Sequence, residues 1–151
     1  MKVGFIGLGH MGGPMCRNII KGGHEVRVHD LSDAAVQTCL AVGGIAAGSV
    51  AGAVSGSEVV MTSLPMPKDV ETVALEPDGI LENAVAGTIY VDLSTNSPAM
   101  MKKIADKMAE EDVIALDGPV SGGVVGAEKA TIAIMVGGNK KAFDSCMPIF
   151  E

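Results

Sequence analysis

Aromatic side chains are scarce in this sequence of 151 residues, which has no tryptophan, one tyrosine and three phenylalanines. The interior must therefore be built mostly from aliphatic side chains, which suit a parallel sheet buried on both faces. Charged residues are also few, at 19%, whereas hydrophobic residues make up 48%. This balance argues against a disordered chain, and the length predicts one domain, residues 1–151, with a substantial core.

Positive charge is in short supply as well, with 11 Lys and Arg against 18 Asp and Glu and a net charge of -7. No basic cluster of the kind that binds nucleic acid is visible, so we expect no nucleic-acid partner. No apolar run approaches the ~20 residues that a membrane-spanning helix needs, and the N-terminus lacks the pattern of a signal peptide. We therefore expect a cytoplasmic location and no membrane partner.

Cysteine is limited to three widely spaced residues, Cys16, Cys39 and Cys146. Their spacing matches no metal-binding motif, so no metal site is expected. We expect all three to be reduced thiols of an intracellular protein.

Short apolar runs alternate with stretches of helical pattern along the whole chain. Strands are predicted at residues 3–6, 26–30, 45–46, 59–64, 88–93, 113–116 and 131–136. Helices are predicted at residues 13–21, 32–40, 49–54, 68–75, 97–110 and 140–150. The order predicts an α/β fold, in which a doubly wound, mostly parallel sheet carries helices on both faces.

A glycine-rich loop with the pattern G-x-G-x-x-G follows the first predicted strand and opens the first helix. In this motif Gly7 makes the tight turn, Gly9 lets the backbone approach a pyrophosphate, and Gly12 lets helix and strand pack closely. The free N–H groups and the positive end of the helix attract phosphate. The loop predicts a Rossmann-type site for a dinucleotide, although a turn without a ligand and a site for S-adenosylmethionine remain alternatives. The candidate loop residues are Gly7, Leu8, Gly9, His10, Met11 and Gly12.

An acidic residue, Asp30, ends the second predicted strand 18 residues after Gly12. Its carboxylate can accept a hydrogen bond from a ribose hydroxyl, worth ~1.5–3 kcal/mol. Opposite the 2′-phosphate of NADP it would instead be repelled, by ~4 kcal/mol at close range in an intermediate dielectric. Because Leu31 follows, and not an arginine that could bind that phosphate, the sequence favours NAD over NADP. A helix-capping role for Asp30 is the alternative.

Five segments resemble, in their order, those of the β-hydroxyacid dehydrogenases. They are the glycine loop with Gly13-Pro14-Met15, Asn18 and Gly23-His24; Ser63-Leu64-Pro65; Asp92-Leu93-Ser94-Thr95; Asp117-Gly118-Pro119-Val120-Ser121-Gly122-Gly123; and Met135-Val136-Gly137-Gly138. That family includes 3-hydroxyisobutyrate dehydrogenase, tartronate semialdehyde reductase and the NAD-binding domain of 6-phosphogluconate dehydrogenase. The resemblance extends over the whole chain, departing from the commonest pattern at Gly118 and Ala130.

The resemblance implies roles for residues outside the glycine loop. It implies that the adenosine and nicotinamide-ribose side of the cofactor is lined by Leu64 and Pro65, with Asp69 and Val70 as neighbours. Thr95 would meet the nicotinamide ribose or carboxamide, unless it only starts the next helix. Residues Ser121, Gly122 and Gly123 would hold the substrate carboxylate, unless they only form a flexible turn.

The function implied by the resemblance is hydride transfer between NAD(H) and a 3-hydroxy acid or its semialdehyde. The family's catalytic lysine lies in an all-helical C-terminal domain beyond Glu151, so residues 1–151 are expected to bind cofactor without useful turnover. None of the three histidines is expected to be catalytic. A stand-alone NAD(H)-binding or sensor module and an imine reductase fragment remain alternatives. A stripe of Phe143, Met147 and Phe150 predicts a homo-oligomer.

Overall fold

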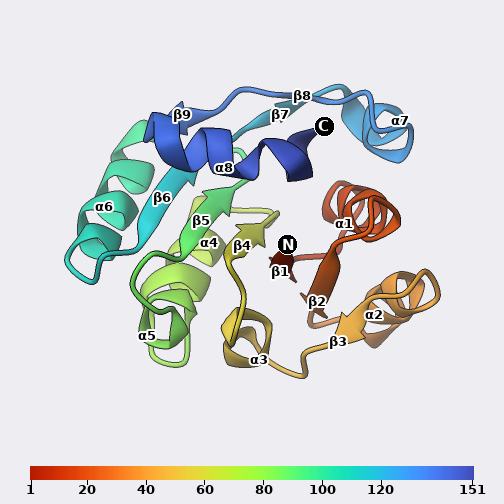
Figure 1. Cartoon of the computed structure of the whole chain (residues 1–151), viewed down its shortest axis with the longest axis horizontal. Coiled ribbons are helices and arrows are strands. Elements are labelled where there is room, and N and C mark those ends of the chain that lie inside the picture. The colour runs from red at the N-terminus through yellow and green to blue at the C-terminus, as the bar shows by residue number, and fades with distance from the viewer.

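Strands and helices alternate along the computed structural model, which describes residues 1–151 (Figure 1). The strands are β1 (Lys2–Ile6), β2 (Glu25–His29), β3 (Ile45–Ala46), β4 (Val59–Thr62), β5 (Ile89–Asp92), β6 (Ile114–Asp117), β7 (Val120–Ser121), β8 (Ala133–Ile134) and β9 (Gly137–Gly138). The helices are α1 (Gly12–Lys21), α2 (Asp33–Leu40), α3 (Val50–Val54), α4 (Pro67–Leu75), α5 (Ile80–Asn83), α6 (Pro98–Ala109), α7 (Gly123–Glu128) and α8 (Lys140–Phe150).

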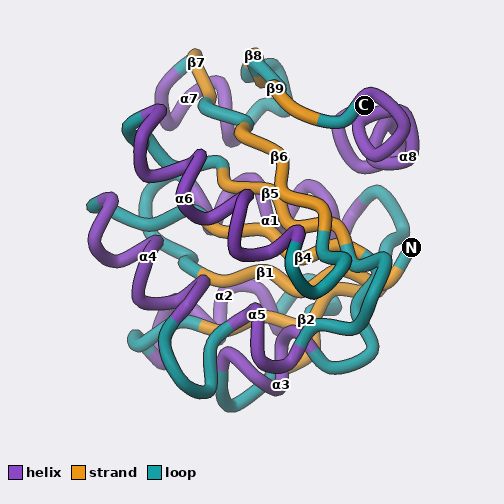
Figure 2. The backbone as a smooth tube through the Cα atoms, turned by 90° about the vertical axis from the view of Figure 1, so that its left-hand side faces the viewer, coloured by secondary structure: helices purple, strands orange, loops and turns teal.

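One sheet contains seven strands in the order β3-β2-β1-β4-β5-β6-β9. The first six are parallel, with Val3 pairing with Val26 on one side and with Val59 on the other. Figure 2 shows these strands stacked from β2 to β6, with β7, α7, β8 and β9 beyond β6. This order is that of a Rossmann fold, so the predicted fold class is confirmed.

Two apolar layers enclose the sheet because successive strand residues point to opposite faces. Val3 and Phe5 lie on the face covered by α1, α2, α7 and α8, in one core cluster with Met15 of α1. Ile6 and Val60 lie on the other face, which α3, α4, α5 and α6 cover. None of the helices is both long and apolar enough to cross a membrane.

The segment after β6 differs from the sequence prediction. The strand predicted at 131–136 shrinks to the two residues of β8, which pair with β7 in a separate sheet. The pair Gly137–Gly138, which lies beyond the predicted strand, forms β9, antiparallel to β6. A Cβ at Gly138 would lie 2.8 Å from Cδ2 of Leu116, so glycine allows the close pairing. Helices α5 and α7 were not predicted.

The residues of helix α8 that face the core differ from the predicted stripe of Phe143, Met147 and Phe150. Ala142, Cys146 and Ile149 are its buried residues. The predicted stripe is half-buried, and the rings of Phe143 and Phe150 lie 6.0 Å apart. The homo-oligomer inferred from that stripe stays a prediction.

Candidate functional site

The candidate cofactor residues gather at one edge of the sheet, where its parallel strands end. The glycine loop follows β1, Asp30 follows β2, Leu64 follows β4 and Thr95 follows β5. Between β1 and β4 the strand order reverses, since α1 covers one face and α3 the other. Open parallel sheets bind their ligands at such a switch point, beyond the carboxyl ends of the strands.

Two glycines of the loop are required by the packing of the protein itself. Gly7 has a φ of 92°, and a Cβ there would lie 2.2 Å from the carbonyl oxygen of Ser63. A Cβ at Gly12 would lie 2.0 Å from the carbonyl oxygen of Gly7. These contacts let α1 begin directly against the loop and the end of β4.

Gly9 has no such requirement. A Cβ built there would meet no protein atom within 4 Å, and its φ is not left-handed. The N–H groups of Gly9, His10 and Met11 have no acceptor within the protein. Helix α1 also begins without a capping side chain or an acidic residue in its first turn, so its positive end is not neutralised locally. These residues fit an anionic group such as a pyrophosphate, lying close to the backbone of Gly9.

The carboxylate of Asp30 connects the loop to the segment after β2. Oδ2 accepts a hydrogen bond from the N–H of Leu8 at 2.6 Å, and Oδ1 accepts one from the N–H of Ser32 at 2.7 Å. Each carboxylate oxygen can accept a second bond, so a ribose hydroxyl can still be bound. Helix α2 is capped by Ser32, whose hydroxyl accepts from the N–H of Ala35. The side chain of Leu31 is 98% exposed beside this carboxylate.

A buried network around Asp92 joins the loops after β4 and β5. Its Oδ1 accepts from the hydroxyl of Thr62 at 2.9 Å and from the N–H of Ser94 at 3.1 Å, while Oδ2 accepts from the amide of Asn96 at 3.0 Å. The hydroxyl of Ser94 then accepts from the N–H of Leu64 at 2.9 Å. The sequence analysis did not predict this network. The polar residue that ends each apolar strand was the feature that could have indicated it.

The remaining predicted cofactor residues have different surroundings. Pro65 and Thr95 are exposed at the carboxyl edge. Asp69 accepts from the N–H of Met66 at 3.1 Å and so caps α4. Val70 is fully buried in the core and presents no surface for the cofactor contact that the sequence predicted.

The predicted substrate residues form an exposed turn between β7 and α7. Gly122 has a φ of 139° and Gly123 a φ of 63°, so both conformations favour glycine. A Cβ at Gly122 would also lie 3.3 Å from Cα of Ile132. The turn alone accounts for both glycines, and the role of Ser121 to Gly123 in holding a carboxylate stays a prediction.

Asp117 lies beside Asp92 at the ends of β6 and β5, where the two residues pair in register. Burial, with a further contribution from the charge of Asp92, raises the pKa of Asp117 above its ordinary value. The folded state therefore binds this proton more tightly than the unfolded chain does. The contribution of protonated Asp117 to the stability of the fold is therefore largest below the ordinary pKa. It is lost as the pH rises through the raised pKa.

We expect Asp117→Asn to raise the melting temperature at neutral pH, because it removes a charge that the fold disfavours. The gain over the parent should disappear below pH 3.8, the ordinary pKa of the group. Thermal melts across this range test it, with exposed Glu111→Gln as a control for loss of one charge. A variant less stable than the parent at neutral pH would contradict the sign.

The histidines serve structural contacts or lie exposed. His24 contacts the N-terminal amine of Met1 through Nδ1 at 3.2 Å and the carbonyl oxygen of Pro148 through Nε2 at 3.0 Å. His10 is exposed in the glycine loop, and His29 is half-buried at the end of β2. No arrangement among them resembles an acid–base pair.

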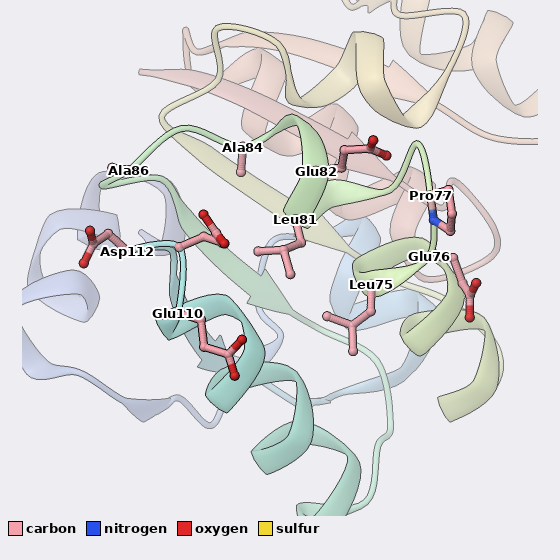
Figure 3. A pocket seen from close by; sticks show the side chains of 10 residues that line it. Leu75, Glu76, Pro77, Leu81, Glu82, Ala84, Ala86, Glu110 and Asp112 are labelled. Carbon is pink, nitrogen blue, oxygen red and sulfur yellow. The ribbon is translucent and has the colours of Figure 1, made fainter.

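A hollow of about 650 Å³ lies away from this edge. It is bounded by α4, α5 and the end of α6, near the amino ends of β5 and β6 (Figure 3). Five carboxylates line it: Glu76, Glu82, Glu110, Glu111 and Asp112. Their charge would repel a dinucleotide, so the hollow is not the cofactor site.

Comparison with known proteins agrees with the geometry at the carboxyl edge. The chain is 41% identical to the NAD-dependent L-serine dehydrogenase of Pseudomonas aeruginosa, over 99% of this chain and 50% of that protein. Among solved structures, 3-hydroxyisobutyrate dehydrogenase of Mycobacterium tuberculosis with L-serine has a TM-score of 0.94 at 35% identity, over 99% of this chain and 50% of that one. Psf3 in complex with NADP+ and 2-OPP has a TM-score of 0.93 at 30% identity, over 98% and 52%.

The chain thus spans about half the length of the curated relatives that it matches. The model of one family, the NAD binding domain of 6-phosphogluconate dehydrogenase, matches residues 2–151. This chain belongs to that family of NAD-binding domains.

Proposed function

We propose that residues 1–151 bind NAD(H) for an oxidoreductase that acts on a small β-hydroxyacid. The observation that carries the proposal is Gly9, whose Cβ would meet no protein atom within 4 Å in a loop of free N–H groups. Since the protein itself does not require glycine there, the missing side chain leaves room for a ligand. The family match over residues 2–151 supports a dinucleotide as that ligand.

The residues of the site divide the work by position along the cofactor. The N–H groups of Gly9, His10 and Met11, with the positive end of α1, bind the pyrophosphate. The carboxylate of Asp30 accepts a hydrogen bond from a hydroxyl of the adenine ribose. Its hydrogen bond from the N–H of Leu8 holds the loop in place. Exposed Pro65 and Thr95 border the nicotinamide half, and Leu64 is fixed there through Ser94.

The cofactor supplies the hydride chemistry when bound, and the protein supplies orientation and electrostatics. The alcohol carbon of the substrate would have to lie beside the nicotinamide end of the site. Ser121, Gly122 and Gly123 are the candidates for its carboxylate, through one hydroxyl and exposed backbone N–H groups.

We expect NADH to bind at least about tenfold more tightly than NADPH, because Asp30 repels a 2′-phosphate. Asp30→Asn keeps the shape of the side chain and removes its charge, so the preference should fall towards equal binding. Titration calorimetry with both cofactors measures this preference. Asp33→Asn, which removes an exposed charge three residues away, is the matched control and should leave the preference unchanged.

Tighter binding of NADPH than of NADH would overturn the NAD assignment. That outcome has a precedent in the family fold, since Psf3 is seen with NADP+. Failure to bind either cofactor would instead overturn the dinucleotide site itself, so the two failures are distinguishable.

An NAD(H) sensor without chemistry and an imine reductase are the alternative functions that the sequence left open. The whole protein should reduce NAD+ when supplied with 3-hydroxyisobutyrate or L-serine, the compounds named for two of the relatives. Binding of NADH without reduction by any β-hydroxyacid would favour the sensor, and turnover of cyclic imines alone would favour an imine reductase. The cytoplasmic location and the homo-oligomer stay predictions.

A further inference from the structure

Two of the three cysteines lie against each other between α1 and α2. Cys16 stands in α1, four residues after Gly12, and Cys39 stands near the end of α2. The two helices pack side by side on the same face of the sheet (Figure 1). Both side chains are 0% exposed and belong to one core cluster, and the two thiols shift each other's pKa.

A neighbouring contact fixes the register of the two helices at this point. Nη1 of Arg17 donates to the hydroxyl of Thr38 at 3.3 Å. The residue after Cys16 thus contacts the residue before Cys39, so the two helices meet at the positions of the cysteines. The third cysteine, Cys146, is buried in α8 and takes no part in this pair.

The two thiols differ in acidity. The pKa of Cys39 is lowered below its ordinary value, chiefly by the thiol of Cys16, with Thr38 and Arg17 acting in the same direction. Hydrogen bonding to Cys39 and burial raise the pKa of Cys16 above its ordinary value. A thiolate beside a protonated thiol is the arrangement in which one sulfur attacks an oxidant and the other resolves the product.

We propose that Cys16 and Cys39 form an oxidation site that closes to a disulfide when the protein meets a small hydroperoxide. The Cys39 thiolate attacks the peroxide oxygen, the O–O bond breaks, and with a proton the leaving group departs as water or an alcohol. The resulting sulfenic acid is attacked by Cys16, which loses its proton as the S–O bond breaks and water leaves. With hydrogen peroxide, two thiols and one peroxide give one disulfide and two waters.

An oxidant can reach the two cysteines if α2 opens, because this helix has few buried contacts with the core. Cys39 is the one fully buried residue of this helix, and most of its other side chains are exposed or half-buried. Elements with so few buried contacts open locally at a low free energy. Brief opening of α2 exposes Cys39 to a small oxidant while the sheet stays folded.

The disulfide would join two segments that both lead to the carboxyl edge of the sheet. Helix α1 begins at the glycine loop, and α2 begins three residues after Asp30. Oxidation therefore fastens the segments on either side of the Asp30–Leu8 hydrogen bond. The proposal itself rests on the two sulfurs alone and stands whether or not the protein binds NAD(H).

The test is a thiol count and a peptide map of the purified, reduced protein after treatment with one equivalent of hydrogen peroxide. Among the three cysteines of residues 1–151, accessible thiols in denaturant should fall from three to one. Trypsin should then release peptide 3–17, which carries Cys16, linked to peptide 28–68, which carries Cys39. The peptide that carries Cys146 should stay reduced, because burial raises the pKa of this thiol to about 11.

Matched variants separate the pair from general oxidation. Cys146→Ala should still lose two thiols and form the same linked peptides, whereas Cys39→Ala and Cys16→Ala should form no internal disulfide. A linkage that includes Cys146, a disulfide between two copies on a non-reducing gel, or an unchanged count in the parent would each overturn the proposal.

Discussion

Replacing Gly9 by alanine should weaken NADH binding by about tenfold or more, a loss of at least 1.4 kcal/mol, while the protein stays folded. The new Cβ meets no protein atom within 4 Å, so the fold accommodates it. Stability should even rise by about 0.4–1 kcal/mol, because alanine reduces the freedom of the unfolded chain. The methyl group instead occupies space that the pyrophosphate needs beside the backbone.

The matched control is Gly12→Ala, which places the same methyl group three residues away. There the Cβ would lie 2.0 Å from the carbonyl oxygen of Gly7, so α1 must move away from the loop. We expect a loss of about 3 kcal/mol or more in the free energy of unfolding, measured in urea. Unchanged NADH affinity in Gly9→Ala would show that no ligand approaches this residue.

Removing the carboxylate of Asp92 should destabilise the protein by about 3–5 kcal/mol. Asp92 is fully buried and accepts hydrogen bonds from Thr62, Ser94 and Asn96. In Asp92→Ala these three donors lose their acceptor, and a cavity forms where water is excluded. Urea denaturation followed by circular dichroism measures the loss.

Two milder variants grade this effect. Asp92→Asn keeps the volume and one acceptor oxygen but turns an amide donor towards another donor, so a loss of about 1–3 kcal/mol is expected. Ser94→Ala removes only the acceptor for the N–H of Leu64, for which about 1 kcal/mol is expected. If all three variants were equally stable, Asp92 would not be the centre of the network.

The alternation of strands and helices could be predicted from sequence because each strand of the parallel sheet is a short apolar run between helical patterns. Helix starts were also readable, since Ser32, Ser49 and Ser97 cap helices in the structure. Residues 118–138 were harder to predict. Their apolar alternation suggested a six-residue strand, but the available partner, β7, has only two residues.

Part of the candidate site could likewise be predicted from the sequence, and part could not. The glycine loop and Asp30 are close in sequence to the strands that position them, so their spacing predicts their geometry. The Asp92 network depends on which strands lie side by side, and that order is not written in any local pattern. The pairing of Cys16 with Cys39 is likewise set by helix packing, 23 residues apart in sequence.

Both edge strands of the seven-stranded sheet, β3 and β9, have only two residues. A long open margin is a template on which a second chain can add a strand and begin a fibre. Two residues offer too few free backbone groups for such growth. Growth of an amyloid-like fibre by adding strands to either edge of this sheet is therefore disfavoured.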